Sequence, residues 1–137
     1  MVKVLTKSKY NNKKTEFNGI LFHSKKECEY YKWLLALKEA GDIKDIKLQP
    51  EFIVFEGERH ISNSKFKDIE SKLFKNKEIK GKQQDIKYIA DFEITLNSGE
   101  KIVIDVKSSE DNLTEVYRIK RKLFLKKYPE IEFFEAY

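Results

Sequence analysis

The chain has 137 residues, 37% of them charged, and a formal net charge of +5. This length is sufficient for one domain with a hydrophobic core but not for two, and the positive charge favours an anionic partner. A single Cys excludes a disulfide framework. Because no apolar run approaches the roughly 20 residues of a membrane span, we expect a soluble protein in the reducing cytoplasm.

Residues 1–14 are predicted to form a flexible basic arm, because they hold too few apolar side chains to bury a core of their own. Lys13 and Lys14, at its end, are candidate DNA contacts. A solvated tail without a role is the alternative. Residues 15–137 are expected to form a single domain.

This domain is predicted to begin with a hairpin and a helix. Asn18-Gly19, the strongest short turn signal, predicts a hairpin over residues 15–22. Ser24 can cap a helix that ends at Gly41. Trp33 is expected to pack in the core, because large aromatic side chains are usually buried. The apolar stripe of the helix is expected to comprise Cys28, Tyr31, Leu34, Leu35, Ala36 and Leu37.

A strand is predicted over residues 51–55, directly after Pro50, and a polar insert over about 56–85. Apolar residues at helical spacing favour a short amphipathic helix over residues 65–75 of the insert. The charged run that follows this segment is expected to be a solvated loop.

Two β-like segments over residues 88–107 are joined by Asn97-Ser98-Gly99. A three-residue loop with Gly99 in the left-handed conformation pairs Leu96 with Glu100 and makes one face of the hairpin entirely apolar. A two-residue loop would shift every pair by one and place acidic and apolar side chains on the same face. The first register is therefore predicted.

This register sets Asp91 directly opposite Asp105, with Lys107 beside Asp105 on the same face. Opposed side chains have Cβ atoms roughly 4.5–5.5 Å apart, so two carboxylates there repel each other unless one is protonated or a cation lies between them. Carboxylate oxygens suit Mg²⁺, with Mn²⁺ as a substitute, whereas Cys28 and the two His residues occur at no recognised zinc spacing.

The carboxylate pair therefore predicts a divalent metal site. Lys107 would lie beside the metal, where a cation can orient an attacking water or offset charge on a phosphate. A surface Asp-x-Lys string without a function is the alternative, because such short strings are common.

A second helix is predicted from about Leu113 to Tyr128, stopped by Pro129, and a final strand over residues 131–137. The buried stripe of the helix is expected to consist of Val116, Ile119, Leu123 and Phe124. Basic side chains crowd its other faces, where a merely soluble surface is the alternative to DNA binding. The expected phosphate contacts are Arg118, Lys120, Arg121 and Lys122.

Asp91, followed after a short hairpin by Asp105-Val106-Lys107, resembles the core motif of the PD-(D/E)XK nuclease superfamily. The flanking words SKKECEYY, LQPEF, YIADF and RIKRKLF are similar to those of small phage nucleases related to the transposon endonuclease TnsA. The likeness covers most of the chain, from about Tyr10 to Tyr128. It implies a restriction-endonuclease-like α/β fold, with an αβββαβ core whose mixed central sheet is flanked by helices. The predicted element order matches that core.

In such nucleases the first Asp and the acid of the (D/E)xK element bind the metal, the Lys supports the attacking water, and an acid on the preceding helix often completes the site. The chain departs from the pattern at Ala90, where the motif has proline, and at Ile104, where an acid is expected in the phage family. Neither departure removes a core ligand. The resemblance thus implies a catalytic set of Asp91, Asp105, Lys107 and Glu27, with the Val106 carbonyl as a further metal ligand.

Two residues keep alternative interpretations. Glu27 also completes a capping box with Ser24, in which its side chain would reach back to the cap amide. Gln49 resembles the Gln before the first core strand in TnsA-like proteins, but an exposed loop Gln without a role is the commoner case.

The residues and the resemblance together predict a Mg²⁺-dependent DNA endonuclease that hydrolyses phosphodiesters. The likeness to phage proteins implies recombination or branched-DNA processing, and a homodimer would be the simplest way to cut both strands. A non-catalytic DNA-binding module on the same fold and an RNA-directed nuclease are the alternatives. Neither a GxSxG elbow nor a P-loop nor a GxGxxG motif supports another chemistry.

Overall fold

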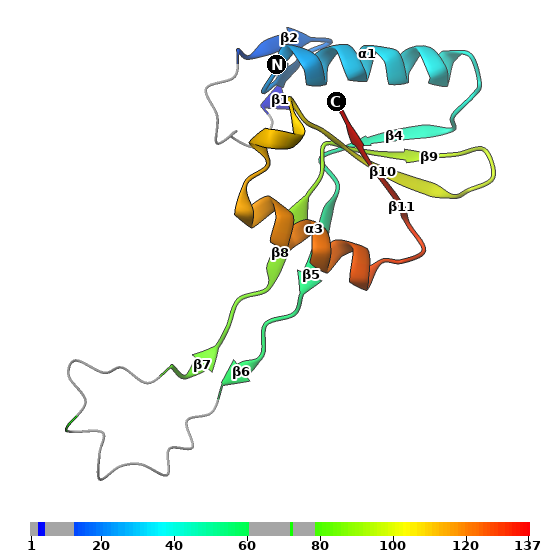
Figure 1. The fold of residues 1–137 in the computed structure, drawn as a ribbon. Coiled ribbons are helices and arrows are strands. Elements are labelled where there is room, and N and C mark those ends of the chain that lie inside the picture. Colours follow the sequence, from blue (N-terminus) through cyan, green and yellow to red (C-terminus); the bar gives the residue numbers. More distant parts are fainter. Residues whose placement is uncertain (1–2, 5–12, 61–71, 73–78) are drawn as a thin grey trace.

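A computed structural model describes residues 3–4, 13–60, 72 and 79–137. Its centre is a four-stranded sheet of order β11-β10-β9-β4 (Figure 1). β10 and β11 are parallel and the other neighbours are antiparallel, so the sheet is mixed, as predicted. The strands are β4 (Asp45–Leu48), β9 (Phe92–Thr95), β10 (Lys101–Val106) and β11 (Glu132–Ala136).

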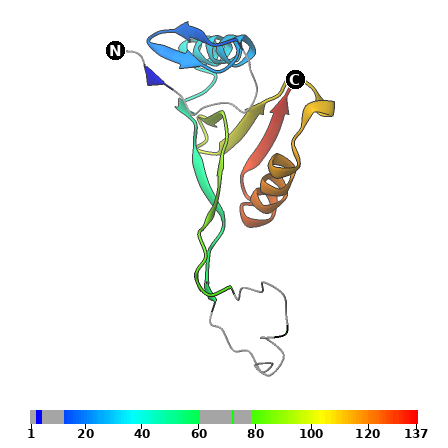
Figure 2. The ribbon, with the colours of Figure 1, turned by 90° about the vertical axis from the view of Figure 1, so that its left-hand side faces the viewer.

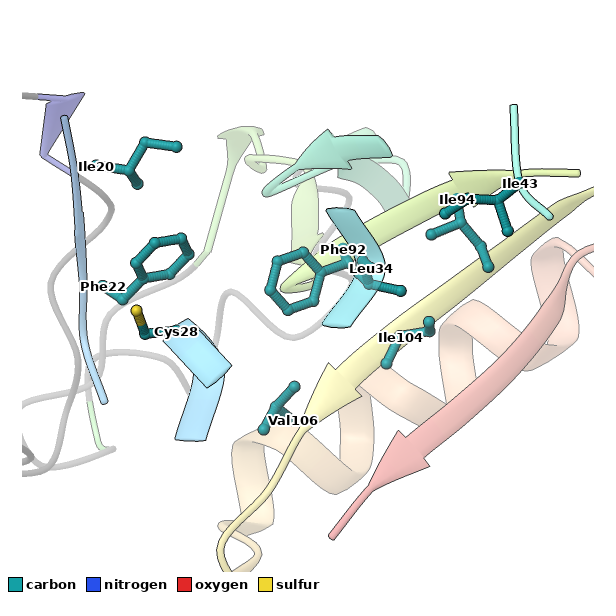
Figure 3. Close-up of a cluster of buried hydrophobic side chains, with 9 residues drawn as sticks. All are labelled: Ile20, Phe22, Cys28, Leu34, Ile43, Phe92, Ile94, Ile104 and Val106. Carbon is teal, nitrogen blue, oxygen red and sulfur yellow. The ribbon is translucent and has the colours of Figure 1, made fainter. Parts of the chain in front are cut away.

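Two helices, α1 (Lys25–Glu39) and α3 (Glu115–Lys127), cover opposite faces of this sheet. The side chains of β10 alternate between the two faces, because successive residues of a strand point to opposite sides. Ile104 and Val106 therefore pack with α1, and Val103 packs with α3. Figure 3 shows the core on the α1 side, with Ile20, Phe22, Cys28, Leu34, Ile43, Phe92, Ile94, Ile104 and Val106.

The predicted hairpin at the start of the domain is confirmed as β2 (Thr15–Phe17) and β3 (Ile20–Phe22). Asn18 and Gly19 both have positive φ, which is the conformation that a tight two-residue turn requires. β1 (Lys3–Val4) adds a parallel strand beside β3.

The predicted helix after Ser24 is confirmed as α1, and Gly41, with φ of 83°, follows its end. Two details of its packing were wrong. Ala36 is exposed and Trp33 is 59% exposed, because the face of α1 that meets the sheet is centred on Cys28 and Leu34 and both side chains lie off that face.

The predicted strand over residues 51–55 is confirmed as β5 (Glu51–Phe55), but it belongs to an arm and not to the central sheet. β5 pairs with β8 (Ile86–Ile89), and β6 (Arg59–His60) pairs with β7 (Gly81–Lys82) at the far end of the arm (Figures 1 and 2). β4, which was not predicted, takes the place in the sheet. The helix expected over residues 65–75 lies outside the described residues, apart from Lys72.

The second helix and the final strand are confirmed as α3 and β11, but the predicted stripe of α3 was partly wrong. Val116 is 47% exposed and Ile119 is 50% exposed, whereas Tyr117 and Phe124 are buried. The aromatic rings of Tyr117 and Phe124 both pack against Tyr88 of β8. Because aromatic side chains bury more area than Val or Ile, they decide which side of α3 faces the sheet.

Candidate active site

The predicted hairpin register is confirmed in the ladder between β9 and β10. Ile94 pairs with Ile102 and Phe92 pairs with Ile104. The Leu96 amide donates to the Glu100 carbonyl at 2.8 Å, and Gly99 has φ of 93°, as the three-residue loop requires. The loop therefore brings the start of β9 to the end of β10.

Asp91 lies one residue beyond this ladder, at the break between β8 and β9. Its carboxylate turns towards β10 and accepts the Val106 amide at 2.6 Å. The main-chain carbonyl of Asp91 accepts the Gln49 amide at 3.0 Å, which ties the break to the loop after β4. Asp105 lies close enough to raise the pKa of the Asp91 carboxyl group, so the two acids share one site, although Asp91 itself lies outside the ladder.

Asp105 is only 4% exposed, and both of its oxygens have partners. The Lys107 ammonium lies 2.8 Å from Oδ1. The Tyr88 hydroxyl donates a short hydrogen bond to Oδ2. A charge this deeply buried requires such partners, because an unpaired carboxylate loses its hydration without compensation.

Glu27 takes part in the same electrostatic cluster from the first turn of α1. Burial, followed by repulsion from Asp105, raises its pKa to about 7, and the attraction of Lys107 opposes this rise. The main-chain amide of Glu27 donates to Ser24 Oγ at 3.1 Å. Ser24 therefore caps this turn as predicted, and Glu27 also lines the site. The other half of the capping box, in which the Glu27 side chain reaches back to the Ser24 amide, stays a prediction.

Burial also raises the pKa of Asp91 well above its ordinary value, and repulsion from Asp105 and Glu27 adds to the effect. Acidic groups that oppose one another's ionisation are an arrangement that a cation would stabilise. Among the described residues, however, no group of three or more His, Cys, Asp or Glu side chains is arranged to hold a metal ion.

A carboxylate pair is nevertheless a suitable donor set for Mg²⁺, which usually keeps several waters and takes one or two carboxylates. Asp91 and Asp105 would be the ligands, with Glu27 close enough to influence both electrostatically. Lys107 contacts Asp105 at 2.8 Å, so one of the two carboxylates already has a positive partner, whereas the pKa of Asp91 remains raised. The donor chemistry fits the predicted metal.

These side chains line a cavity of about 530 Å³ between the N-terminal turn of α1 and the start of α3. Four lysines stand against three acids in its wall, which makes it suitable for an anionic ligand. Ile89, Leu113 and Val116 add an apolar rim. The charged lining residues are Lys26, Lys87, Lys107, Lys120, Glu27, Asp91 and Asp105.

The remaining predicted residues are placed unevenly. Gln49, with φ of 46°, and Val106 both line the cavity. Of the expected DNA contacts, Lys120 lines the cavity, and Arg121 pairs through Nη1 with Glu135 Oε2 at 2.7 Å. Exposed on the surface are Lys13, Lys14, Arg118 and Lys122.

Sequence reasoning missed several lining residues. Tyr88 and Tyr117 were not predicted as site residues. The interruption between β8 and β9 brings Tyr88 to Asp105, and the rotation of α3 about its axis brings Tyr117 to Lys107. No local pattern announces either contact. His23, only 8% exposed, also lines the cavity, and its Nε2 has no hydrogen-bond partner in the part of the chain that the structure describes.

No helix among the described residues is long and apolar enough to cross a membrane.

Comparison with known proteins identifies a family for the chain. No curated protein and no solved structure matched the chain. A family model with the description "Protein of unknown function (DUF1064)" matches residues 7–135, nearly the whole chain, so the protein belongs to this family.

Proposed function

We propose that the protein is a Mg²⁺-dependent nuclease that hydrolyses phosphodiesters in DNA. The observation that carries the proposal is the meeting of Asp91 and Asp105 at a strand end, with the Lys107 ammonium 2.8 Å from Asp105. When bound, a divalent ion would supply a Lewis acid for the phosphate and a more acidic water.

The protein's own groups divide the work. Asp91 and Asp105 would hold the ion. Asp91 is oriented by the Val106 amide and Asp105 by the Tyr88 hydroxyl, so neither carboxylate is free to rotate away. Glu27, which lines the same cavity, would hold or orient a second ion or a water. Lys107 would orient the attacking water or offset phosphate charge.

The surroundings support an anionic substrate. Lys26, Lys87 and Lys120 share the cavity wall with the acids, and the chain carries a net charge of +5. Phosphate contacts of this kind supply most sequence-independent affinity for DNA. The order α1, β4, β9, β10, α3, β11 along the chain also agrees with the αβββαβ core that the resemblance implies.

The proposal is tested by incubating the purified protein with linear, nicked, branched and single-stranded DNA and with RNA, each with Mg²⁺, with Mn²⁺ and with a chelator. We expect cleavage of at least one DNA form that depends on the metal. Preference for a branched form would support a role in recombination, and cleavage of RNA alone would replace the proposed substrate.

Asp91→Asn is the informative variant, because asparagine can still accept the Val106 amide but is a poor ligand for Mg²⁺. Cleavage should be lost although DNA is still bound. If the wild-type protein binds DNA but cleaves none of these nucleic acids, the chain is instead a non-catalytic DNA-binding module.

A further inference from the structure

Both the main chain and the side chain of Lys107 are held by contacts, although lysine is among the most flexible side chains. Its main-chain amide donates to the Ala136 carbonyl of β11 at 2.8 Å. Its carbonyl accepts the Lys26 ammonium at 2.8 Å. These bonds fix the backbone but leave four side-chain torsions to be fixed by other contacts.

The ring of Tyr117 makes the other contact with the Lys107 ammonium. The Lys107 nitrogen lies 3.7 Å from the ring centroid, well within the distance for a cation–π interaction, and 2.8 Å from Asp105 Oδ1. The ammonium is thus clamped between a carboxylate and an aromatic face. Because the Lys107 side chain is only 24% exposed, water competes little with either contact.

The Tyr117 ring is itself fixed from behind. Its hydroxyl donates to Glu135 Oε2 at 2.6 Å, and Arg121 Nη1 donates to the same oxygen at 2.7 Å. Glu135 lies opposite Asp105 in the parallel ladder of β10 and β11. The main-chain amide of Tyr117 donates to the Thr114 cap at 3.1 Å, so side chain and backbone are both held.

We propose that Tyr117 is a positioning residue whose ring holds the Lys107 ammonium at the candidate active site. The inference rests on the proposed function of this site for its catalytic consequence. The positioning itself does not depend on that function. Tyr117 lies in the first turn of α3, and its hydroxyl group donates to Glu135 and not to a proposed metal ligand. Its effect is therefore exerted through Lys107.

The test compares Tyr117→Leu, which removes the ring, with Tyr117→Phe, which keeps the ring and loses only the bond to Glu135. The first readout is the NMR spectrum of the Lys107 side chain, assigned by its absence in Lys107→Ala. A methylene group next to a ring face is shifted upfield. We expect this upfield shift in the wild type and in Tyr117→Phe and its loss in Tyr117→Leu.

The second readout is metal-dependent cleavage under single-turnover conditions. Tyr117→Leu should lower the rate about tenfold, which corresponds to about 1.4 kcal/mol, with DNA affinity unchanged. Tyr117→Phe should retain most of the rate. The double variant with Lys107→Ala should be no slower than Lys107→Ala alone, because the ring would then have nothing to position.

Tyr128→Phe and Tyr128→Leu are the matched controls. Tyr128 also packs from α3 against the aromatic core, and its hydroxyl donates to the Ile53 carbonyl at 2.8 Å, away from the site. Both Tyr128 variants should lower the melting temperature without changing the NMR signals of Lys107 or the cleavage rate. If Tyr117→Leu unfolds the protein, Tyr117→Met, which fills irregular spaces without a ring, takes its place.

An unchanged Lys107 spectrum in the variant without a ring would overturn the proposal. So would a rate loss that adds fully to that of Lys107→Ala. If the wild-type protein cleaves nothing, the proposed nuclease function fails, but the NMR comparison still decides whether Tyr117 positions Lys107.

Discussion

Replacing Glu27 by glutamine should stabilise the metal-free protein at high pH. The folded protein keeps the Glu27 proton up to a pKa of about 7, whereas an ordinary glutamic acid releases it near 4.5. Between these values the folded state binds more protons than the unfolded state. Stability from this group is therefore present below about 4.5 and is lost as the pH rises towards 7 and above. Glutamine carries no charge at any pH and escapes this loss.

The size of the effect follows from the displaced pKa. A rise from 4.5 to about 7 corresponds to at most about 3–4 kcal/mol, at about 1.4 kcal/mol for each pH unit. Glu27 keeps some contact with solvent, which screens the repulsion, so we expect about 1–2 kcal/mol. For a chain of this size that difference raises the melting temperature by roughly 3–8 °C.

Thermal unfolding in the presence of a chelator, followed by circular dichroism at about pH 4.5 and about pH 8, measures this difference. Glu29→Gln is the matched control, since Glu29 lies two residues further along α1, is exposed and pairs with Lys32. We expect no such gain there. A Glu27→Gln variant that is no more stable than the wild type at about pH 8 would refute the raised pKa of Glu27 and leave this residue with its position in the capped turn only.

Four further changes test the site and its surface. Asp91→Asn should also stabilise the metal-free protein above neutral pH, because it removes a buried acid whose pKa is raised and keeps the acceptor for the Val106 amide. Chemical denaturation in the presence of a chelator measures this gain. Lys107→Ala should destabilise the metal-free protein by about 1–3 kcal/mol, because Asp105 loses its counter-charge. The variant should bind DNA normally but cleave it far more slowly. Normal cleavage together with a shallower salt dependence of DNA binding would make Lys107 an ordinary phosphate contact. Lys122→Ala should leave stability unchanged and lower the salt slope of DNA binding by about one, whereas Arg121→Ala should lower the melting temperature, because Arg121 is bound to Glu135.

The hairpin could be predicted because its signals are local. Gly99 determines the loop, and the alternation of apolar residues then determines every pair of β9 and β10. This register predicted that Asp91, Asp105 and Lys107 lie together, although Asp91 and Lys107 lie just beyond the paired strands. The same holds for the ends of α1 and for the turn at Asn18 and Gly19, where the residues that define the conformation are adjacent.

The rest depends on contacts between distant segments. The break between β8 and β9 directs β8 into the arm, so β4 and not β5 pairs with β9. The buried stripe of α3 was predicted without Tyr117, because the hydroxyl group of tyrosine is polar. In the structure this hydroxyl donates to Glu135 on β11, and the residue is buried. Trp33 shows the converse: its large aromatic ring is exposed because it does not lie on the face of α1 that packs against the sheet.

The most direct measurement of the central claim is single-turnover cleavage by the wild-type protein and by Asp105→Asn on the DNA form that the wild type cuts best. DNA binding is measured in parallel at the same Mg²⁺ concentration. The account predicts cleavage that stops when the metal is chelated, and a loss of about a thousandfold or more in the variant with binding retained. Equal cleavage by the two proteins, or cleavage by the wild type that persists with a chelator, would contradict it.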